Sequence, residues 1–413
     1  MLNEIILSLI FIEIIFFVFS LYVRKNNQWF IINKDKKPKF TKEVLEKVLT
    51  KSYDQILGWD RKPNTSGSEK GKYGVVYWNI NASGARDNLD YNHQKSFISL
   101  FGDSFTFARE VNDNETWGYK LSLLTQSNVQ NFGVGNYGFD QALIKLNTKL
   151  KSENFRPEIV IIGVVPDTIS RILSVWKHYY EYGNIFGFKP RYTLTDGKIK
   201  LIDNIIDSKD KFATYEKYIG QIQQYDYFYK NKFLKEIVSF PYSIHFMKNL
   251  KRNFSLSIET LQKGHIDKPT DYIMNNNLEY RVNLYKDKNN IDLLIEELKL
   301  FETLSKEYNF KACFLVMPQK DDVKYIQTKK DHFYKTLIDR IPDNIEYIDI
   351  FENLKGYSSE QLDSLYSEKS DYGGHFSNRG NEFIANVLYR KLIETEMIQN
   401  KPTQQNIKTK ENA

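Results

Sequence analysis

The sequence lacks several features that identify common classes of protein. It has a single cysteine among 413 residues, so no internal disulfide can form, and Cys313 stands in an apolar run where a packed thiol is expected. No glycine-rich phosphate loop follows the first predicted strand, which argues against a nucleotide-binding protein. The six histidines show no ligand spacing with cysteines or carboxylates, so neither a metal nor another cofactor is predicted.

Charge is also nearly balanced. There are 58 basic and 52 acidic residues, a net charge of +6, and the lysines are spread along the chain rather than clustered. This distribution does not favour a nucleic-acid partner. With 41% hydrophobic and 15% aromatic residues, a chain of this length can bury a substantial core.

One long apolar run, residues 5–23, has about the length that a helix needs to cross a bilayer, and residues 1–25 are predicted to be a transmembrane anchor. Basic residues follow the run and Glu4 precedes it, so the positive-inside rule puts the main domain of a single-pass membrane protein on the cytoplasmic face. The absence of a basic segment before the run disfavours a signal peptide. Glu13 is costly inside a bilayer, so we expect it to be neutral or to face a partner helix, and a buried soluble helix is the alternative.

Beyond a connector and irregular lead-in, residues 26–95, short apolar runs alternate with helical periodicity. The predicted strands are 97–101, 129–132, 158–165, 311–317 and 345–350, and the predicted helices are 117–124, one from 140, 291–308, 333–341 and 381–394. Strands separated by helices favour parallel pairing, so residues 96–396 are predicted to form a three-layer α/β/α flavodoxin-like sandwich with a five-stranded parallel sheet. Residues 168–290 are a long insert between strands 3 and 4 and a candidate lid, and 397–413 are expected to be a disordered tail.

Two blocks carry groups suited to nucleophilic catalysis. The first apolar run ends in Gly-Asp-Ser at Ser104, and Asp371 and His375 precede the last helix. A serine hydroxyl needs a base to take its proton and a third group to orient that base. We therefore predict Ser104 as nucleophile, His375 as base and Asp371 as its orienting carboxylate, with a backbone carbonyl as the alternative orienting group. A helix N-cap serine and a loop histidine are the non-catalytic interpretation.

These blocks resemble those of the SGNH (GDSL-like) hydrolases, in particular the membrane-anchored, envelope-associated members, over roughly residues 57–392. Three further segments share the resemblance: Asn81 to Arg86, Thr116-Trp117 and Asn131 to Gln141. The resemblance implies an oxyanion hole with three donors: the Ser104 amide, a backbone amide in the family's second block, which here is Asn131 to Gln141, and an asparagine side chain in its third block, which follows the third strand. Here Gly135 and Asn136 stand in the second block, and either can supply the donor.

The third block departs from the family pattern. Pro166, which has no N–H, stands where the asparagine is expected, and Asp167 beside it is kept as a candidate binding residue. In the insert, Arg171 and His178 lie among aromatic residues that are suited to stacking on sugar rings, and both are candidate substrate contacts. Simple packing of these aromatic residues on the core is the alternative.

The sequence thus predicts an SGNH-type serine ester hydrolase or O-acyltransferase. The expected substrate is an O-acyl group, above all acetyl, of a cell-surface glycan or its lipid-linked precursor. The alternative is a catalytically degenerate membrane protein of the same fold that binds glycan or acts as an assembly scaffold, because loss of one oxyanion donor can cost about 10²–10³ in rate.

Overall fold

The computed structural model describes residues 2–32, 38–71, 74–91, 93–152, 154–266, 270–367 and 374–399. The chain divides into two compact units. Unit 1 is assigned residues 1–60 and 170–284, and unit 2 is assigned residues 61–169 and 285–413. Asp371 and most of the predicted tail lie outside the described residues.

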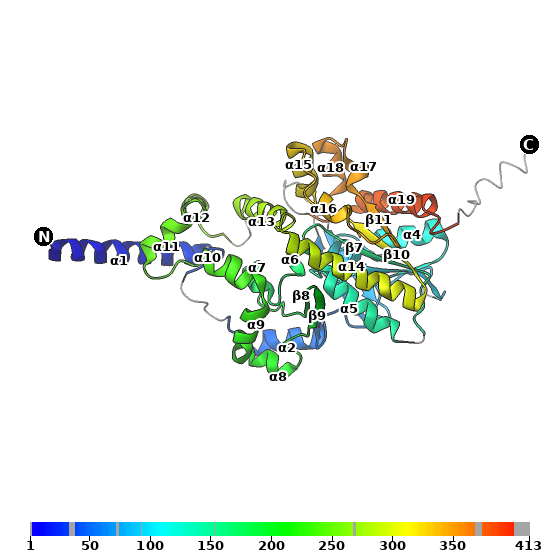
Figure 1. The fold of residues 1–413 in the computed structure, drawn as a ribbon, viewed down its shortest axis with the longest axis horizontal. Coiled ribbons are helices and arrows are strands. Elements are labelled where there is room, and N and C mark those ends of the chain that lie inside the picture. Colours follow the sequence, from blue (N-terminus) through cyan, green and yellow to red (C-terminus); the bar gives the residue numbers. More distant parts are fainter. Residues whose placement is uncertain are drawn as a thin grey trace, which may run out of the picture. The chain divides into compact units, whose positions relative to one another are not determined.

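Unit 2 is built on a five-stranded parallel sheet (Figure 1). Its strands are β5 (Ser96–Gly102), β6 (Asn128–Asn131), β7 (Ile159–Val164), β10 (Lys311–Val316) and β11 (Ile345–Asp349). They lie in the order β11-β10-β7-β5-β6, which is the flavodoxin-like order when followed from β6. Every residue of β7 is buried, as expected of a central parallel strand that is covered on both faces. The predicted five-stranded parallel sandwich is confirmed.

Helices cover both faces of this sheet. On one face α5 (Phe139–Leu150) packs against α14 (Lys288–Tyr308), and α4 (Trp117–Thr125) packs against α19 (Asn378–Glu394) on the other (Figure 1). This division follows from right-handed crossovers that leave β5 in opposite directions along the sheet. The shorter helices of unit 2 are α3 (Ser104–Phe107), α15 (Lys320–Lys329), α16 (Lys335–Ile338), α17 (Phe351–Leu354) and α18 (Ser359–Leu365).

Two local predictions for unit 2 are wrong. The helix expected over 333–341 is the single turn α16, and the longer helix of this connection is α15, which begins at a capping box of Gln319 and Asp322. The lead-in contains an antiparallel hairpin of β3 (Thr65–Gly71) and β4 (Gly74–Ile80). Strand β3 is polar and buries none of its residues, and three of the five buried residues of α15 are charged (Lys320, Asp321 and Asp322), so neither element has a strong apolar period.

Unit 1 contains the apolar helix α1 (Leu2–Asn26), which is long and apolar enough to cross a membrane and is almost entirely unburied. The predicted insert folds together with the first sixty residues rather than as a separate body. Its strands are β1 (Tyr53–Asp54), β2 (Gly58–Trp59), β8 (Arg191–Thr195) and β9 (Lys198–Ile202). Its other helices are α2 (Lys42–Lys51), α7 (Lys177–Tyr180), α8 (Lys209–Ala213), α9 (Ile219–Tyr225), α10 (Leu234–Glu236), α11 (Tyr242–Lys248), α12 (Leu250–Lys263) and α13 (Asp271–Leu284), and α6 (Thr168–Arg171) lies at the boundary of the two units.

The carboxyl ends of β5 and β7 approach each other closely. Gly102 has a φ of 145°, and a Cβ added to it would lie 1.8 Å from the carbonyl oxygen of Gly163. No other residue type fits this position without moving the neighbouring strand. The close approach places the turn after β5 directly beside the end of β7.

We predict that Gly102→Ala destabilises unit 2 by roughly 3 kcal/mol or more, because the new methyl group overlaps backbone and the backbone conformation is strained. Gly356→Ala is the matched control, since a Cβ there meets no atom within 4 Å. Thermal unfolding of the two variants measures the difference. Equal melting temperatures would show that β5 and β7 do not meet as described.

Candidate active site

Ser104 opens the short helix α3 at the carboxyl end of β5. Asp103 is the N-cap of this helix, and its carboxylate accepts from the amide of Phe105 at 2.8 Å. The other carboxylate oxygen of Asp103 accepts from the amide of Val165 at 3.1 Å, beyond the end of β7. The side chain of Thr106 donates to the Gly163 carbonyl at 2.7 Å. The turn that carries Ser104 is therefore fixed to the neighbouring strand.

His375 lies within hydrogen-bond distance of Ser104. Its Nε2 is 2.7 Å from Ser104 Oγ, and its ring packs on Phe105 with a centroid distance of 4.8 Å. The 271 residues that separate the two side chains in sequence are bridged by the parallel sheet. The structure thus brings together the predicted nucleophile and base.

Trp117 and Asn381 connect the segments that carry these two groups. The Trp117 indole donates to the carbonyl of Phe105 at 3.0 Å, and its amide donates to Asn381 Oδ1 at 3.0 Å. The Asn381 amide group in turn donates to the carbonyl of Phe376 at 3.2 Å. The Thr116-Trp117 segment therefore has a structural role beside the serine turn.

Glu110 is a residue at this site that the sequence analysis missed. Its Oε1 lies 3.9 Å from His375 Nδ1, on the side of the ring opposite to Ser104, and both side chains are mostly buried. This distance is too long for a hydrogen bond, but it suffices for an ion pair with a protonated imidazole. No spacing relative to His375 marks Glu110, because the two residues meet only through the fold.

The turn that carries Glu110 is held by the buried guanidinium of Arg86. The Arg86 side chain pairs with Asp113 at 2.7 Å. It also donates to three carbonyls of the same turn, those of Phe107 (2.6 Å), Ala108 (2.8 Å) and Val111 (2.5 Å). Burial lowers the pKa of Arg86, while the Asp113 charge opposes that shift. Arg86 is the last residue of the Asn81–Arg86 segment noted in the sequence, so that segment supports the turn after Ser104.

The second block lies beside Ser104. A Cβ added to Gly135 would lie 4.0 Å from the Cβ of Ser104, and Asn136 adopts a left-handed backbone with φ of 69°. The third block, residues 165–167, offers fewer hydrogen-bond donors for an oxyanion. The Val165 amide is already bonded to Asp103, and Pro166 has no N–H. Neither Val165 nor Pro166 therefore offers a backbone donor to a group bound at Ser104.

The remaining predicted residues fall in different places. Asp167 is buried in unit 2, whereas Arg171 and His178 belong to unit 1. His178 is 3% exposed and packs on Trp176 with a centroid distance of 4.6 Å, and burial lowers its pKa to about 4. A substrate contact by these three residues stays a prediction. Asp371 is not among the described residues, so its orienting role also stays a prediction.

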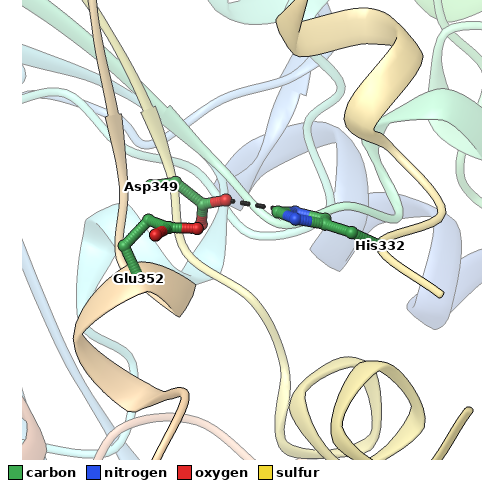
Figure 2. A group of neighbouring side chains, drawn as sticks. All are labelled: His332, Asp349 and Glu352. Atoms are coloured by element: carbon green, nitrogen blue, oxygen red, sulfur yellow. Dashed lines mark ion pairs between the residues drawn. The ribbon is translucent and has the colours of Figure 1, made fainter. Parts of the chain in front are cut away.

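A second cluster of polar side chains lies at the carboxyl end of β11. His332, Asp349 and Glu352 place one ligand-type atom each within 4.8 Å of one another, which is a geometry that could hold a metal ion (Figure 2). Asp349 already accepts from the amide of Phe351 at 2.9 Å and from the Tyr334 hydroxyl at 3.2 Å. Glu352 forms an ion pair with Lys355. These contacts account for both carboxylates without a cation.

Comparison with known proteins gives structural matches only. No protein-family model and no curated protein matches the sequence. A protein of the G-D-S-L lipolytic family from Desulfitobacterium hafniense DCB-2 matches with a TM-score of 0.30 at 11% identity, over 71% of this chain and 98% of that one.

Two carbohydrate-active proteins also match. A carbohydrate esterase family 2 enzyme with a carbohydrate-binding domain from Corynascus thermopiles (Myceliophthora fergusii) has a TM-score of 0.32 at 9% identity, over 78% of this chain and 77% of that one. An acetyl xylan esterase from the rumen bacterium Butyrivibrio proteoclasticus has a TM-score of 0.27 at 9% identity, over 76% and 67%.

The fold of unit 2 is defined by its strand order and by the side-chain geometry at the edge of its sheet. Ser104 follows β5, the first strand of the parallel sheet, and His375 precedes the last helix, α19. The two side chains meet at the carboxyl edge of the sheet. Unit 2 is therefore a flavodoxin-like α/β/α sandwich with a serine–histidine pair at the carboxyl edge of its sheet, as the sequence predicts.

Proposed function

We propose that unit 2 is a serine esterase or O-acyltransferase of the SGNH type. The observation that carries the proposal is the 2.7 Å contact between His375 Nε2 and Ser104 Oγ. It gives the serine hydroxyl a base within direct reach, which attack on an ester carbonyl requires. The Glu110 carboxylate faces the other ring nitrogen, where it stabilises the imidazolium that forms when His375 takes the proton.

The reaction would proceed through an acyl-enzyme. Ser104 Oγ attacks the carbonyl carbon while His375 takes its proton, and the Ser104 amide and an amide of Gly135 or Asn136 hold the oxyanion. The imidazolium returns the proton to the leaving alkoxide as the ester C–O bond breaks. Water or a sugar hydroxyl, deprotonated by His375, then attacks the acyl carbon, and the bond to Ser104 Oγ breaks as the imidazolium returns its proton to that oxygen. Hydrolysis and transfer differ only in this last acceptor.

The substrate is proposed to be an O-acyl group, above all acetyl, of a cell-surface glycan or its lipid-linked precursor. An anchor formed by α1 would hold the enzyme at the membrane on which such glycans are assembled. Asp167, Arg171 and His178 are the proposed polar contacts to substrate. Asp371 stays the predicted carboxylate that orients His375.

A binding or scaffolding role is the second candidate. It is favoured by the third block, where the Val165 amide is bonded to Asp103 and Pro166 offers no donor. With a weakened oxyanion hole, the same fold can bind an acylated glycan without turning it over.

A fluorophosphonate probe and a small activated ester separate the two candidates. We expect the wild-type chain to be labelled by the probe and to hydrolyse the ester. Ser104→Ala should be neither labelled nor active, and His375→Ala should hydrolyse the ester about 10²- to 10⁴-fold more slowly. Ser359→Ala, at an exposed serine of α18, is the control and should behave like the wild type. Hydrolysis by Ser104→Ala at the wild-type rate would refute the proposal. A folded wild type that neither labels nor hydrolyses would favour the scaffold.

Glu110→Gln tests the group behind His375. Loss of the charge should lower kcat by roughly ten- to a hundredfold with little change in KM, because an orienting charge contributes less than the base itself, which supplies about 10²–10⁴. Glu360→Gln, at an exposed glutamate of α18, is the control. If Asp371→Asn lowers kcat and Glu110→Gln does not, Asp371 rather than Glu110 is the orienting group.

We further propose that α1 is a single-pass anchor with unit 2 on the cytoplasmic side, because basic residues follow the apolar run. A phosphatase reporter that is active only after export should be inactive when fused beyond Glu394. A reporter that works only in the cytoplasm should be active at the same position. The reverse pattern would put unit 2 outside and change the proposed substrate from the precursor to the translocated glycan.

A further inference from the structure

Glu13 stands in the middle of the apolar helix α1 and has partners from another helix. Its carboxylate accepts from the amide of Tyr242 at 2.6 Å and from the amide of Ser243 at 3.2 Å, and the Ser243 hydroxyl also donates to it. These amides lie at the start of α11, where backbone N–H groups have no partner within their own helix. The partner helix expected beside Glu13 is therefore present, and it is α11.

Helices α11 and α12 form a hairpin, residues 240–263, that packs on the second half of α1. The Phe246 ring lies 5.3 Å from the ring of Phe16 and 6.1 Å from that of Phe19. Phe246 and Leu256 also join a buried cluster with Val23. The hairpin is thus part of unit 1 and is attached to α1 by apolar packing and by the Glu13 contacts.

Helix α12 lies across α1 rather than along it (Figure 1). On one side, Arg252 donates to the carbonyl of Trp29 at 2.7 Å and Asn27 donates to Thr260 at 3.4 Å, so that side meets the chain just beyond α1. On another side, Phe254, Ile258 and Leu261 line an apolar groove of about 270 Å³ with residues 15, 16 and 19 of α1. The side of α12 that carries Phe254, Ile258 and Leu261 therefore borders the apolar part of α1.

Large apolar side chains of the hairpin stay exposed, both along the rim of this groove and beyond it. They are Phe240, Ile244, Met247, Leu250, Phe254 and Leu261, and Phe240 is 71% exposed. Leu250, Phe254 and Leu261 are spaced by four and seven residues, so they lie on one face of α12. Exposed lysines at 248 and 251 flank the turn between the two helices. The apolar surface continues into that of α1, whose side chains are also exposed.

We propose that the hairpin 240–263 is a second membrane-binding element, in which α12 lies in the plane of the bilayer with Leu250, Phe254 and Leu261 against the acyl chains. Because α12 packs on residues 15, 16 and 19 of α1, its apolar face enters the hydrocarbon of one leaflet, and its long lysine side chains reach toward anionic headgroups. The contact with Tyr242 and Ser243 also supplies the hydrogen bonds that a carboxylate at Glu13 needs in a nonpolar environment. The proposal rests on the membrane insertion of α1 and is independent of the esterase activity.

Site-directed spin labelling of the full chain tests this arrangement. Nitroxides are attached to Ile10→Cys on α1, Phe254→Cys on the apolar stripe and Gln262→Cys on the polar exposed side of α12, in vesicles of equal parts phosphatidylcholine and phosphatidylglycerol. Cys313 is fully buried, so the unmodified chain serves as the labelling blank. Phe254 and Gln262 are both exposed, so neither substitution disturbs the core.

Collision with oxygen, which concentrates in lipid, is compared with collision with a water-soluble nickel complex. We expect the oxygen-to-nickel ratio to be severalfold higher at positions 10 and 254 than at 262. A high ratio at 10 with low ratios at 254 and 262 would leave the α1 anchor intact and overturn the hairpin proposal. A low ratio at position 10 would overturn both the anchor and the hairpin.

Discussion

The carboxylate of Asp103 is the interaction on which the candidate site depends. It caps α3 through Phe105 and binds the amide of Val165, so it fixes the end of β5 to the end of β7. Ser104 is thereby held at the first turn of α3, at the edge where parallel sheets expose reactive groups. The same contact occupies the Val165 amide, so the bond that fixes the serine turn also removes one backbone donor, while Pro166 beside it has no N–H of its own.

Arg86 extends this rigidity to the turn that carries Glu110. A guanidinium that is 2% exposed is tolerated only when its donors are satisfied, and Asp113 and three backbone carbonyls do this. Removing one partner of such a buried pair leaves an uncompensated charge, which costs more than the pair contributes. The lead-in before the sheet is therefore a structural support of the site and not merely a connector.

In unit 1, chain segments far apart in sequence are joined in a similar way. Glu13 and the start of α11 are separated by 229 residues, yet the hydrogen bonds between them fix the hairpin beside the apolar helix. A polar residue in an apolar run is usually a sign that a partner is present, because an unpaired carboxylate in a nonpolar environment is costly. The partner itself is recognisable only in the folded chain.

Local pattern alone determined the five strands, the parallel α/β architecture and the positions of Ser104 and His375, because apolar period and turn residues act over a few neighbours. It did not reveal the hairpin of β3 and β4, whose first strand is polar and unburied, or α15, most of whose buried residues are charged. The contact of Glu110 with His375 and the partner of Glu13 were decided only by tertiary structure. Each joins residues whose separation carries no periodic signal, and the distance between them depends on strand order and helix packing, which no local stretch of sequence specifies.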